Sequence, residues 1–436
     1  MLFERPAAGR KAVLLHVSFG QETAAAARER LQELAELATS AAMAVVEQVT
    51  ARRRDPHPRW FVGSGKLEEL KLLLSQVAAD VLVVNHELSP GQQRNIEETL
   101  GIGVLSRTEL ILNIFADRAR THEGQLQVEL AQCKHAKTRL VRGWTHLDRQ
   151  KGGVGMRGAG EKQIELDQRM LDARIKSVQQ KLARVRARRA QGRRRRRREE
   201  VPTVALVGYT NAGKSTLFNA LTSGEVMAED RLFATLDPTL RRLALPGLGD
   251  VVLADTVGFI RDLPHDLVEA FKATLEEVAG ADLLLHVIDG ADPLAAERVE
   301  DVRQVLAELD AHELPCLLVL NKSDLPGANL PLELAAATDD GVRVSALTGA
   351  GLTSLKRRIA MLLGPVEPLT IRLGPEHGRT LAWLYEIGAV VSQSGHADGG
   401  WEICARLDDA ALGRLRKAGG VVLQGLEGVH RISCEQ

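Results

Sequence analysis

An α/β architecture is the fold class that this sequence predicts, and the alternation of short apolar runs with helix-sized segments is the main reason. With 436 residues the chain is too long for one core and should divide into about three compact units. It has no apolar run of the roughly 18 residues that a membrane span needs, and its first residues lack a signal-peptide pattern. We therefore expect an unexported, cytoplasmic protein without stable membrane insertion.

Residues 1–120 are predicted to form an N-terminal α/β domain. The expected strands are 12–17, 45–49 and 81–84, and the expected helices are 22–38 and 66–78.

Residues 121–200 are predicted to form an antiparallel helical hairpin with a basic, Gly-rich tip. Apolar residues recur at heptad spacing in two stretches, namely Leu126, Leu130, Cys133 and Leu140, then Ile164, Leu171, Ile175, Val178, Leu182 and Val185. Two amphipathic helices on a globular core are the alternative, because such stripes often mean only burial. The segment 142–160 between the stretches should be a mobile tip, since it holds six glycines. Its candidate RNA contacts are Arg142, Trp144, Arg149, Lys151 and Arg157.

The net charge of zero hides a strong imbalance between the two parts of the chain. Residues 1–200 hold 37 Lys and Arg against 24 Asp and Glu, or +13, whereas residues 201–436 hold 20 against 33, or −13. Residues 174–198 contain thirteen basic and no acidic residues, and end in six arginines. Self-repulsion should leave the end of this run disordered. It is either a solvated linker or a contact for RNA or another polyanion.

The cysteines are far apart and form no Cys-x-x-Cys pair, which argues against a disulfide framework and a zinc site. Cys133, Cys316, Cys404 and Cys434 are expected to be buried thiols.

Residues 201–364 should form a doubly wound, mostly parallel sheet, and residues 365–436 a small α+β domain. In the first region the expected strands are 204–207, 251–254, 283–288, 317–320 and 342–344. In the second, a helix is expected near 379–388, and strands near 401–407 and 421–423.

A phosphate-binding loop is predicted between the strand 204–207 and the helix that follows. Its residues are Gly208, Tyr209, Thr210, Asn211, Ala212, Gly213, Lys214 and Ser215, followed by Thr216. The glycines let successive N–H groups surround a phosphate, and the helix N-terminus adds positive potential. Lys214 would neutralise the β and γ phosphates, and Ser215 would ligate Mg²⁺.

Two further segments are predicted to meet the γ-phosphate and the metal. Asp255, Thr256, Val257 and Gly258 close the strand 251–254. Asp255 can hold Mg²⁺ through a water, and the Gly258 N–H can bind the γ-phosphate. In the mobile segment Phe233, Ala234, Thr235, Leu236 and Asp237, the threonine is the candidate Mg²⁺ ligand, with Thr239 as its rival.

Guanine selection is predicted at the ends of two later strands. Asn321, Lys322, Ser323 and Asp324 close the strand 317–320, and Ser345, Ala346 and Leu347 follow the strand 342–344. The Asp324 carboxylate can accept from the ring N–H and the amino group of guanine, a donor pair that adenine lacks. The set therefore predicts a protein that binds GTP and GDP and hydrolyses GTP.

Intrinsic hydrolysis should be slow, because Phe259 follows Gly258 where Ras-like enzymes place a water-orienting glutamine. Asn211 could hold a potassium ion against the phosphates in place of an arginine finger, or could merely brace its loop.

Specific matches outside these motifs make the chain resemble the HflX family of ribosome-associated GTPases over nearly its whole length. They are residues 57–66 (HPRWFVGSGK), 118–124 (RARTHEG), 140–147 (LVRGWTHL), 232–240 (LFATLDPTL) and 255–261 (DTVGFIR). The resemblance favours Thr235 over Thr239 as the magnesium threonine. Lys162, in 158–165 (GAGEKQIE), departs from the threonine that is usual in the family, as does the length of the arginine run.

The resemblance implies a GTPase, a monomer in solution, that docks on the large ribosomal subunit, is stimulated there, and splits stalled or idle ribosomes under stress. Its hairpin tip would approach the ribosomal RNA of the peptidyl-transferase region. One alternative is an RNA chaperone or helicase-like factor whose N-terminal domain also binds ATP, although residues 63–66 (GSGK) are too short for a phosphate loop. Another is a membrane-surface switch whose arginine run binds anionic lipid.

Overall fold

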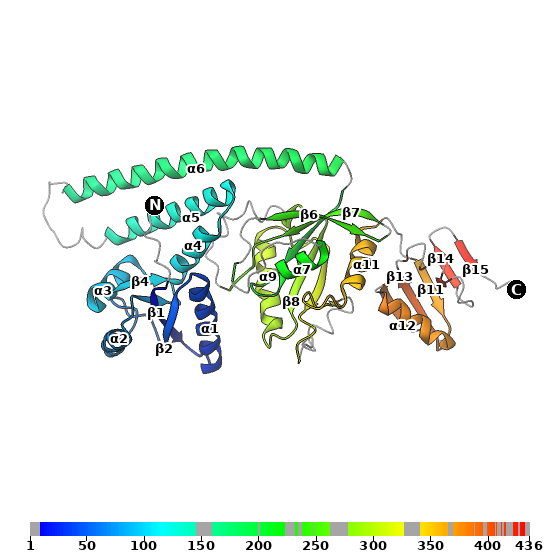
Figure 1. Ribbon diagram of the computed structural model, residues 1–436, viewed down its shortest axis with the longest axis horizontal. Coiled ribbons are helices and arrows are strands. Elements are labelled where there is room, and N and C mark those ends of the chain that lie inside the picture. The colour runs from blue at the N-terminus through cyan, green and yellow to red at the C-terminus, as the bar shows by residue number, and fades with distance from the viewer. Residues whose placement is uncertain are drawn as a thin grey trace. The chain divides into compact units, whose positions relative to one another are not determined.

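The computed structural model divides the chain into two compact units (Figure 1). The first comprises Met1–Gly192, Glu229–Asp237 and Asp262–Thr274, and the second comprises Arg193–Ala228, Pro238–Arg261 and Leu275–Gln436. The residues that the structure describes are 9–144, 159–198, 201–222, 232–233, 238–246, 248–261, 278–326, 341–364, 369–387, 389–395, 399–405, 407, 411, 414–415, 422–425 and 428–431.

The first unit begins with a parallel sheet of order β2-β1-β3-β4. Its strands are β1 (Lys11–Phe19), β2 (Ala44–Arg53), β3 (Val81–Val84) and β4 (Gly103–Ser106), and the helices among them are α1 (Ala24–Ser40), α2 (Ser64–Val77), α3 (Pro90–Leu100) and α4 (Arg107–Arg118). The sequence analysis missed β4, α3 and α4. Helix α3 is mostly polar and starts from a Ser89–Gln92 capping box, so its apolar stripe is too thin to recognise.

The predicted antiparallel hairpin is present as α5 (His122–Trp144) and α6 (Ala159–Arg198). Leu126 and Leu130 of α5 pack with Val178 and Leu182 of α6 in one buried cluster. An ion pair of 2.5 Å between Lys137 and Asp172 also joins the two helices. Four of the predicted heptad residues, with Ile175 packed against them, therefore form a helix-to-helix seam.

Helix α6 continues through the arginine run to Arg198, so the prediction of disorder at its end is wrong. Arginine is a good helix former, and in a helix successive charges point in different directions, which reduces their repulsion. The tip residues Arg149, Lys151 and Arg157 lie outside the described residues, whereas Arg142 and Trp144 belong to the last turns of α5.

The second unit contains a six-stranded sheet of order β10-β9-β8-β5-β7-β6, parallel except for the β6–β7 pair. Its strands are β5 (Thr203–Val207), β6 (Thr239–Leu245), β7 (Gly249–Asp255), β8 (Leu283–Asp289), β9 (Cys316–Asn321) and β10 (Val342–Arg343). Strand β6 was missed because two adjacent arginines, Arg241 and Arg242, interrupt its short apolar pattern. The chain leaves β5 first toward β7 and β6 and later toward β8, so the carboxyl end of β5 lies at a topological switch point.

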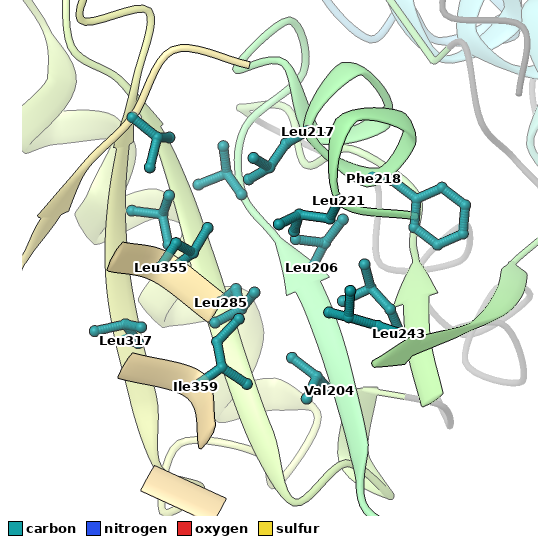
Figure 2. Close-up of a cluster of buried hydrophobic side chains, with 14 of the residues drawn as sticks. Val204, Leu206, Leu217, Phe218, Leu221, Leu243, Leu285, Leu317, Leu355 and Ile359 are labelled. Carbon is teal, nitrogen blue, oxygen red and sulfur yellow. The ribbon is translucent and has the colours of Figure 1, made fainter. Parts of the chain in front are cut away.

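Helices cover both faces of this sheet, as the doubly wound prediction requires. On one face α7 (Lys214–Thr222) and α11 (Leu352–Leu363) bury a cluster that includes Leu206, Leu285 and Phe218 (Figure 2). On the other face Ala205 and Leu284 pack against α9 (Ala295–Glu308) through Val302 and Leu306. These two layers hold the strand ends, and the loops that follow them, in fixed positions.

The last part of the second unit is an antiparallel sheet of order β12-β13-β11-β14-β15, which confirms the α+β prediction. Its elements are β11 (Leu369–Leu373), a 3₁₀ turn (Pro375–His377), α12 (Gly378–Glu386), β12 (Val390–Gly395), β13 (Trp401–Ala405), β14 (Val422–Gly425) and β15 (Gly428–Arg431). The sequence analysis missed β11, β12 and β15. Strand β12 shows no alternation, since every residue after Val390 is exposed.

Two further findings concern the described part of the chain. It contains no helix both long and apolar enough to cross a membrane. Cys133 is a buried thiol as expected, but Cys316 is exposed at the start of β9, so the expectation of burial is wrong there.

Candidate functional site

The loop 208–213 joins β5 to α7 in a conformation that glycine makes possible. Gly208 and Gly213 have φ values of +148° and +87°, and a Cβ on them would lie 2.3 Å from the Val287 carbonyl oxygen and 2.2 Å from the Asn321 amide nitrogen. Asn211, exposed at the loop's turn, has φ of +62°, a left-handed value that asparagine tolerates. The chain therefore makes a tight turn of the kind that can direct backbone N–H groups at a phosphate.

Lys214 places a buried cation at the start of α7. Its ammonium donates to the carbonyl oxygens of Gly208, at 2.9 Å, and Tyr209, at 2.7 Å. Burial lowers the pKa of Lys214 to about 8, although the nearby charge of Asp255 acts in the opposite direction. A phosphate beside this ammonium would compensate its desolvation, so the residue suits a polyanionic ligand.

Ser215 and Asp255 meet at the predicted metal site. The Ser215 hydroxyl donates to a carboxylate oxygen of Asp255 at 2.8 Å, and Asp255 is fully buried at the end of β7. Thr256 is fixed by a bond from its hydroxyl to the Leu206 carbonyl oxygen. A hydroxyl and a carboxylate side by side are the hard oxygen donors that Mg²⁺ prefers, so the residues present fit that ion.

Gly258 lies directly beside the lysine. A Cβ at Gly258 would be 3.1 Å from the Lys214 ammonium and 2.8 Å from the Thr210 methyl group. The Phe259 side chain is 2% exposed and belongs to the hydrophobic core between the sheet and α9. Phe259 is therefore a core residue and does not offer a group that could orient water.

Asn321 connects the phosphate loop to the predicted base pocket. Its amide donates to the Ala212 carbonyl oxygen at 2.9 Å, and its side-chain oxygen accepts from the Ala346 N–H at 3.0 Å. Sequence reasoning placed Asn321 in the pocket but did not reveal that it holds two other loops together. This role is a product of the sheet, which brings the ends of β5, β9 and β10 to one edge.

The remaining pocket residues lie at the same edge. Lys322 has φ of +61° and pairs with Asp289 at 2.8 Å. Asp324 is exposed, Ser345 is fully buried and accepts from the Thr348 N–H, and Leu347 is 82% exposed. Sequence reasoning missed Asp289, although its position at the carboxyl end of β8 could have drawn attention to it.

The predicted mobile segment is described only at its start. Leu232 donates its N–H to the Ser40 hydroxyl at 3.0 Å, and Phe233 packs edge-on against Phe115 with ring centroids 4.7 Å apart. Both residues are buried within the first unit. Ala234, Thr235, Leu236 and Asp237 lie outside the described residues, and Thr239 begins β6.

Residues 63–66, which are too short for a phosphate loop, form the turn that leads into α2. Gly63 caps the helix with φ of −74°, and the Lys66 ammonium pairs with Glu69 at 2.8 Å on the same helix. This geometry differs from the loop 208–213, where two glycines have positive φ and the lysine faces backbone carbonyls.

The fold and the site together define a P-loop nucleotide-binding protein of the GTPase class. Four family models match the chain in succession: a GTP-binding GTPase N-terminal region at residues 28–116, a GTP-binding GTPase middle region at 118–196, a 50S ribosome-binding GTPase at 203–322, and an HflX C-terminal domain at 332–424. The chain belongs to the HflX family of GTPases, which confirms the resemblance seen in its sequence.

Individual relatives match over nearly the full length. GTPase HflX of Escherichia coli K12 is 50% identical over 419 residues, which is 95% of this chain and 98% of the relative. GTPase HflX of Magnetococcus marinus is 46% identical over 424 residues, or 96% of each chain. Among solved structures, the GDP complex of a GTP-binding protein from Sulfolobus solfataricus is 25% identical and covers 81% of this chain and 98% of that one, with a TM-score of 0.45.

Proposed function

We propose that this GTPase binds the large ribosomal subunit, hydrolyses GTP there, and separates stalled or idle ribosomes into subunits under stress. The observation that carries the proposal is the buried side chain of Phe259, which stands where Ras-like enzymes place a water-orienting glutamine. An enzyme without this glutamine should hydrolyse GTP slowly until an activator supplies the missing orientation of the attacking water. The match of residues 203–322 to a family described as 50S ribosome-binding supports the large subunit in that role.

Within the site, we assign the phosphates to Lys214 and the N–H groups of residues 208–213, and Mg²⁺ to Ser215, Asp255 and Thr235. The 2.8 Å contact between Ser215 and Asp255 supports the metal assignment. When bound, the ion would neutralise charge on the β and γ phosphates. Asp324 is assigned to guanine, and the exposure of its side chain leaves it accessible to a base.

Contact with ribosomal RNA is assigned to the end of the hairpin, through Arg142, Trp144, Arg149, Lys151 and Arg157. The seam between α5 and α6 supports this assignment, because a paired hairpin can project its tip away from the rest of the unit. Cationic side chains would bind phosphates, and Trp144 would stack on an unpaired base. The monomeric state and cytoplasmic location expected from the sequence stay predictions.

GTP turnover with and without purified ribosomal subunits tests the proposal. We expect the large subunit to raise the turnover number at least tenfold and the small subunit to leave it near the basal rate. Equal rates in all three reactions would contradict the proposal.

The same assay in potassium and in sodium salts tests Asn211. Its exposed position and left-handed backbone support a role beside the phosphates, where it would help to hold a potassium ion. Faster hydrolysis in potassium, lost in Asn211→Ala, is the expected result, and identical rates in the two salts would leave Asn211 as a brace for its loop.

A further inference from the structure

The residues that follow Gly258 are joined to the phosphate loop by backbone hydrogen bonds. The Thr210 N–H donates to the Phe259 carbonyl oxygen at 2.7 Å, and the Phe259 N–H donates to the Gly208 carbonyl oxygen at 3.1 Å. Together they form an isolated parallel bridge between Tyr209 and Phe259. The phosphate loop and this part of the chain are therefore held at a fixed spacing.

Tyr209 adds a side-chain contact to the same bridge. Its phenol oxygen accepts the Arg261 N–H at 2.9 Å, and its ring is 8% exposed. The Arg298 guanidinium lies 4.7 Å from the ring centroid, on the aromatic face, and pairs with Asp292 at 2.7 Å. This cation–π contact keeps the tyrosine ring against α9 and its hydroxyl in reach of Arg261.

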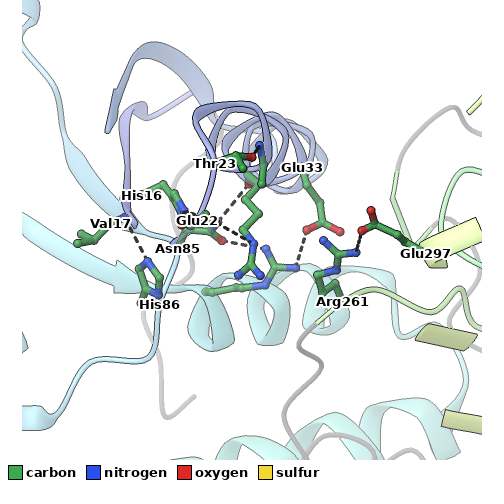
Figure 3. Close-up of polar contacts among 12 residues, drawn as sticks. His16, Val17, Glu22, Thr23, Glu33, Asn85, His86, Arg261 and Glu297 are labelled. Atoms are coloured by element: carbon green, nitrogen blue, oxygen red, sulfur yellow. Dashed lines mark hydrogen bonds and ion pairs between the residues drawn. The ribbon is translucent and has the colours of Figure 1, made fainter. Parts of the chain in front are cut away.

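Whereas Tyr209 accepts from the Arg261 backbone, the Arg261 side chain is bound by two carboxylates of α9. Its guanidinium contacts Glu297 at 2.9 Å and Asp301 at 3.3 Å, and the contact with Glu297 is visible in Figure 3. Residues 297 and 301 are four apart, so they lie on one face of the helix. Burial by itself would lower the pKa of Arg261, but the Glu297 and Asp301 carboxylates raise it above its ordinary value. The contacts leave the arginine side chain only 20% exposed, and they tie the chain at residue 261 to a rigid helix.

We propose that Arg261 is a positioning residue that makes the site favour GTP over GDP. Gly258 lies between two anchored points, Asp255 at the end of β7 and the Arg261 clamp formed with Glu297 and Asp301. The backbone at Gly258 is thus held beside the Lys214 ammonium, since a Cβ built on this glycine would lie 3.1 Å from it. A donor that is already in place loses no free energy to reorganisation when the γ-phosphate binds. GDP lacks that phosphate, so it gains nothing from the clamp.

The inference rests on the proposed contact of Gly258 with the γ-phosphate, and its test separates the two ideas. Dissociation constants for GDP and for a non-hydrolysable GTP analogue are measured by calorimetry with Mg²⁺ on the full chain. For Arg261→Ala we expect about tenfold weaker binding of the analogue and a change of less than twofold for GDP. Arg261→Lys should lie between, because an ammonium cannot bridge two carboxylates as a guanidinium does.

A second variant tests the inference independently of whether Arg261→Ala folds. The double variant Glu297→Gln, Asp301→Asn keeps Arg261 and removes the negative charges of these two partners. It should reproduce the weaker binding of the GTP analogue with little change for GDP. Glu300→Gln is the matched control, since Glu300 lies on the same helix in an exposed pair with Arg303 at 3.7 Å. Its affinities should equal those of the unaltered chain.

The possible outcomes are distinct. An unchanged ratio of the two affinities in Arg261→Ala overturns the inference, and so does equal weakening of GDP and the analogue, which would mean general structural support. If the unaltered chain binds neither nucleotide, the assignment of the site itself fails.

Discussion

Charge at single positions determines how the site receives its ligand. Burial lowers the pKa of Lys214 to about 8, which is still above neutral pH, so the protonated form predominates. Its ammonium donates to two backbone carbonyl oxygens and forms no direct hydrogen bond to a carboxylate in the described structure. A phosphate can therefore approach the cation. Asp255 is directed to Ser215. The Lys214 ammonium and the Ser215–Asp255 pair proposed for Mg²⁺ therefore make separate hydrogen bonds.

Selectivity for guanine over adenine should depend mainly on Asp324. Replacement by alanine removes two charge-assisted hydrogen bonds, about 3 kcal/mol in total, so GTP should bind roughly a hundredfold more weakly. Calorimetry with GTP and with ATP measures the effect, and Asp250→Ala, at an exposed pair with Arg242, is the control. An Asp324→Ala protein that still prefers GTP to ATP by the original factor would contradict the assignment.

A pH dependence of stability is expected from His86 in the first unit. Its ring stacks on His16 at 5.0 Å and accepts the Val17 N–H, and burial lowers its pKa to about 4. Because the unfolded chain binds this proton near pH 6.5, stability is full above that pH and falls as the pH drops from 6.5 toward 4. The loss from this group should be on the order of 1 to 2 kcal/mol at pH 5.

Urea unfolding at pH 7.5 and pH 5 measures this loss, with His86→Gln for comparison because glutamine can still accept the Val17 N–H. The midpoint should fall less in the variant between the two pH values. Equal falls in the two proteins would show that His86 does not contribute.

At the scale of elements, the hairpin and the six-stranded sheet have separate tasks. The seam of Leu126, Leu130, Val178 and Leu182 stabilises α5 and α6 without contributions from the nucleotide site. We therefore expect that changes in the predicted tip, residues 142–160, leave the loops at the ends of β5, β7 and β9 undisturbed.

Replacing residues 142–160 by a short Gly-Ser linker should abolish separation of ribosomal subunits and leave the GTP affinity within a factor of two. Density-gradient sedimentation of ribosomes measures separation, and calorimetry measures affinity. The triple variant Arg194→Ala, Arg195→Ala, Arg196→Ala tests the arginine run. If this variant still separates ribosomal subunits, the run acts as a linker. Normal separation by the tip-replaced protein would argue against an RNA contact at the tip.

At the scale of the whole molecule, the opposite charges of the two parts of the chain predict different responses to salt. Residues 1–200 carry a net charge of +13, so their contacts with RNA phosphates should release counterions. Co-sedimentation with large subunits should weaken at least tenfold between about 50 and 200 mM KCl. GTP binding to the acidic part should change far less, and a ribosome affinity that is insensitive to salt would exclude electrostatic docking.

Much of this protein could be inferred from local sequence. The motif 208–215 is chemically specific, and heptad spacing identified the seam residues of α5 and α6. Short or polar elements were missed, because β4 has only four residues and α3 has a thin apolar stripe. The disorder expected of the arginine run was wrong because repulsion was weighed without the helix propensity of arginine.

The sequence by itself determined the fold class and the family, and it predicted which residues would contact the phosphates, the metal and the base, because these depend on residue types in order along the chain. The tertiary structure alone decided which side chains support those contacts. Asn321 holds two loops, Phe259 is buried in the core, and Arg261 meets Glu297 and Asp301 only because the sheet brings distant strand ends and α9 together. Contacts between residues 25 to 109 positions apart leave no local pattern, since they depend on how the layers pack.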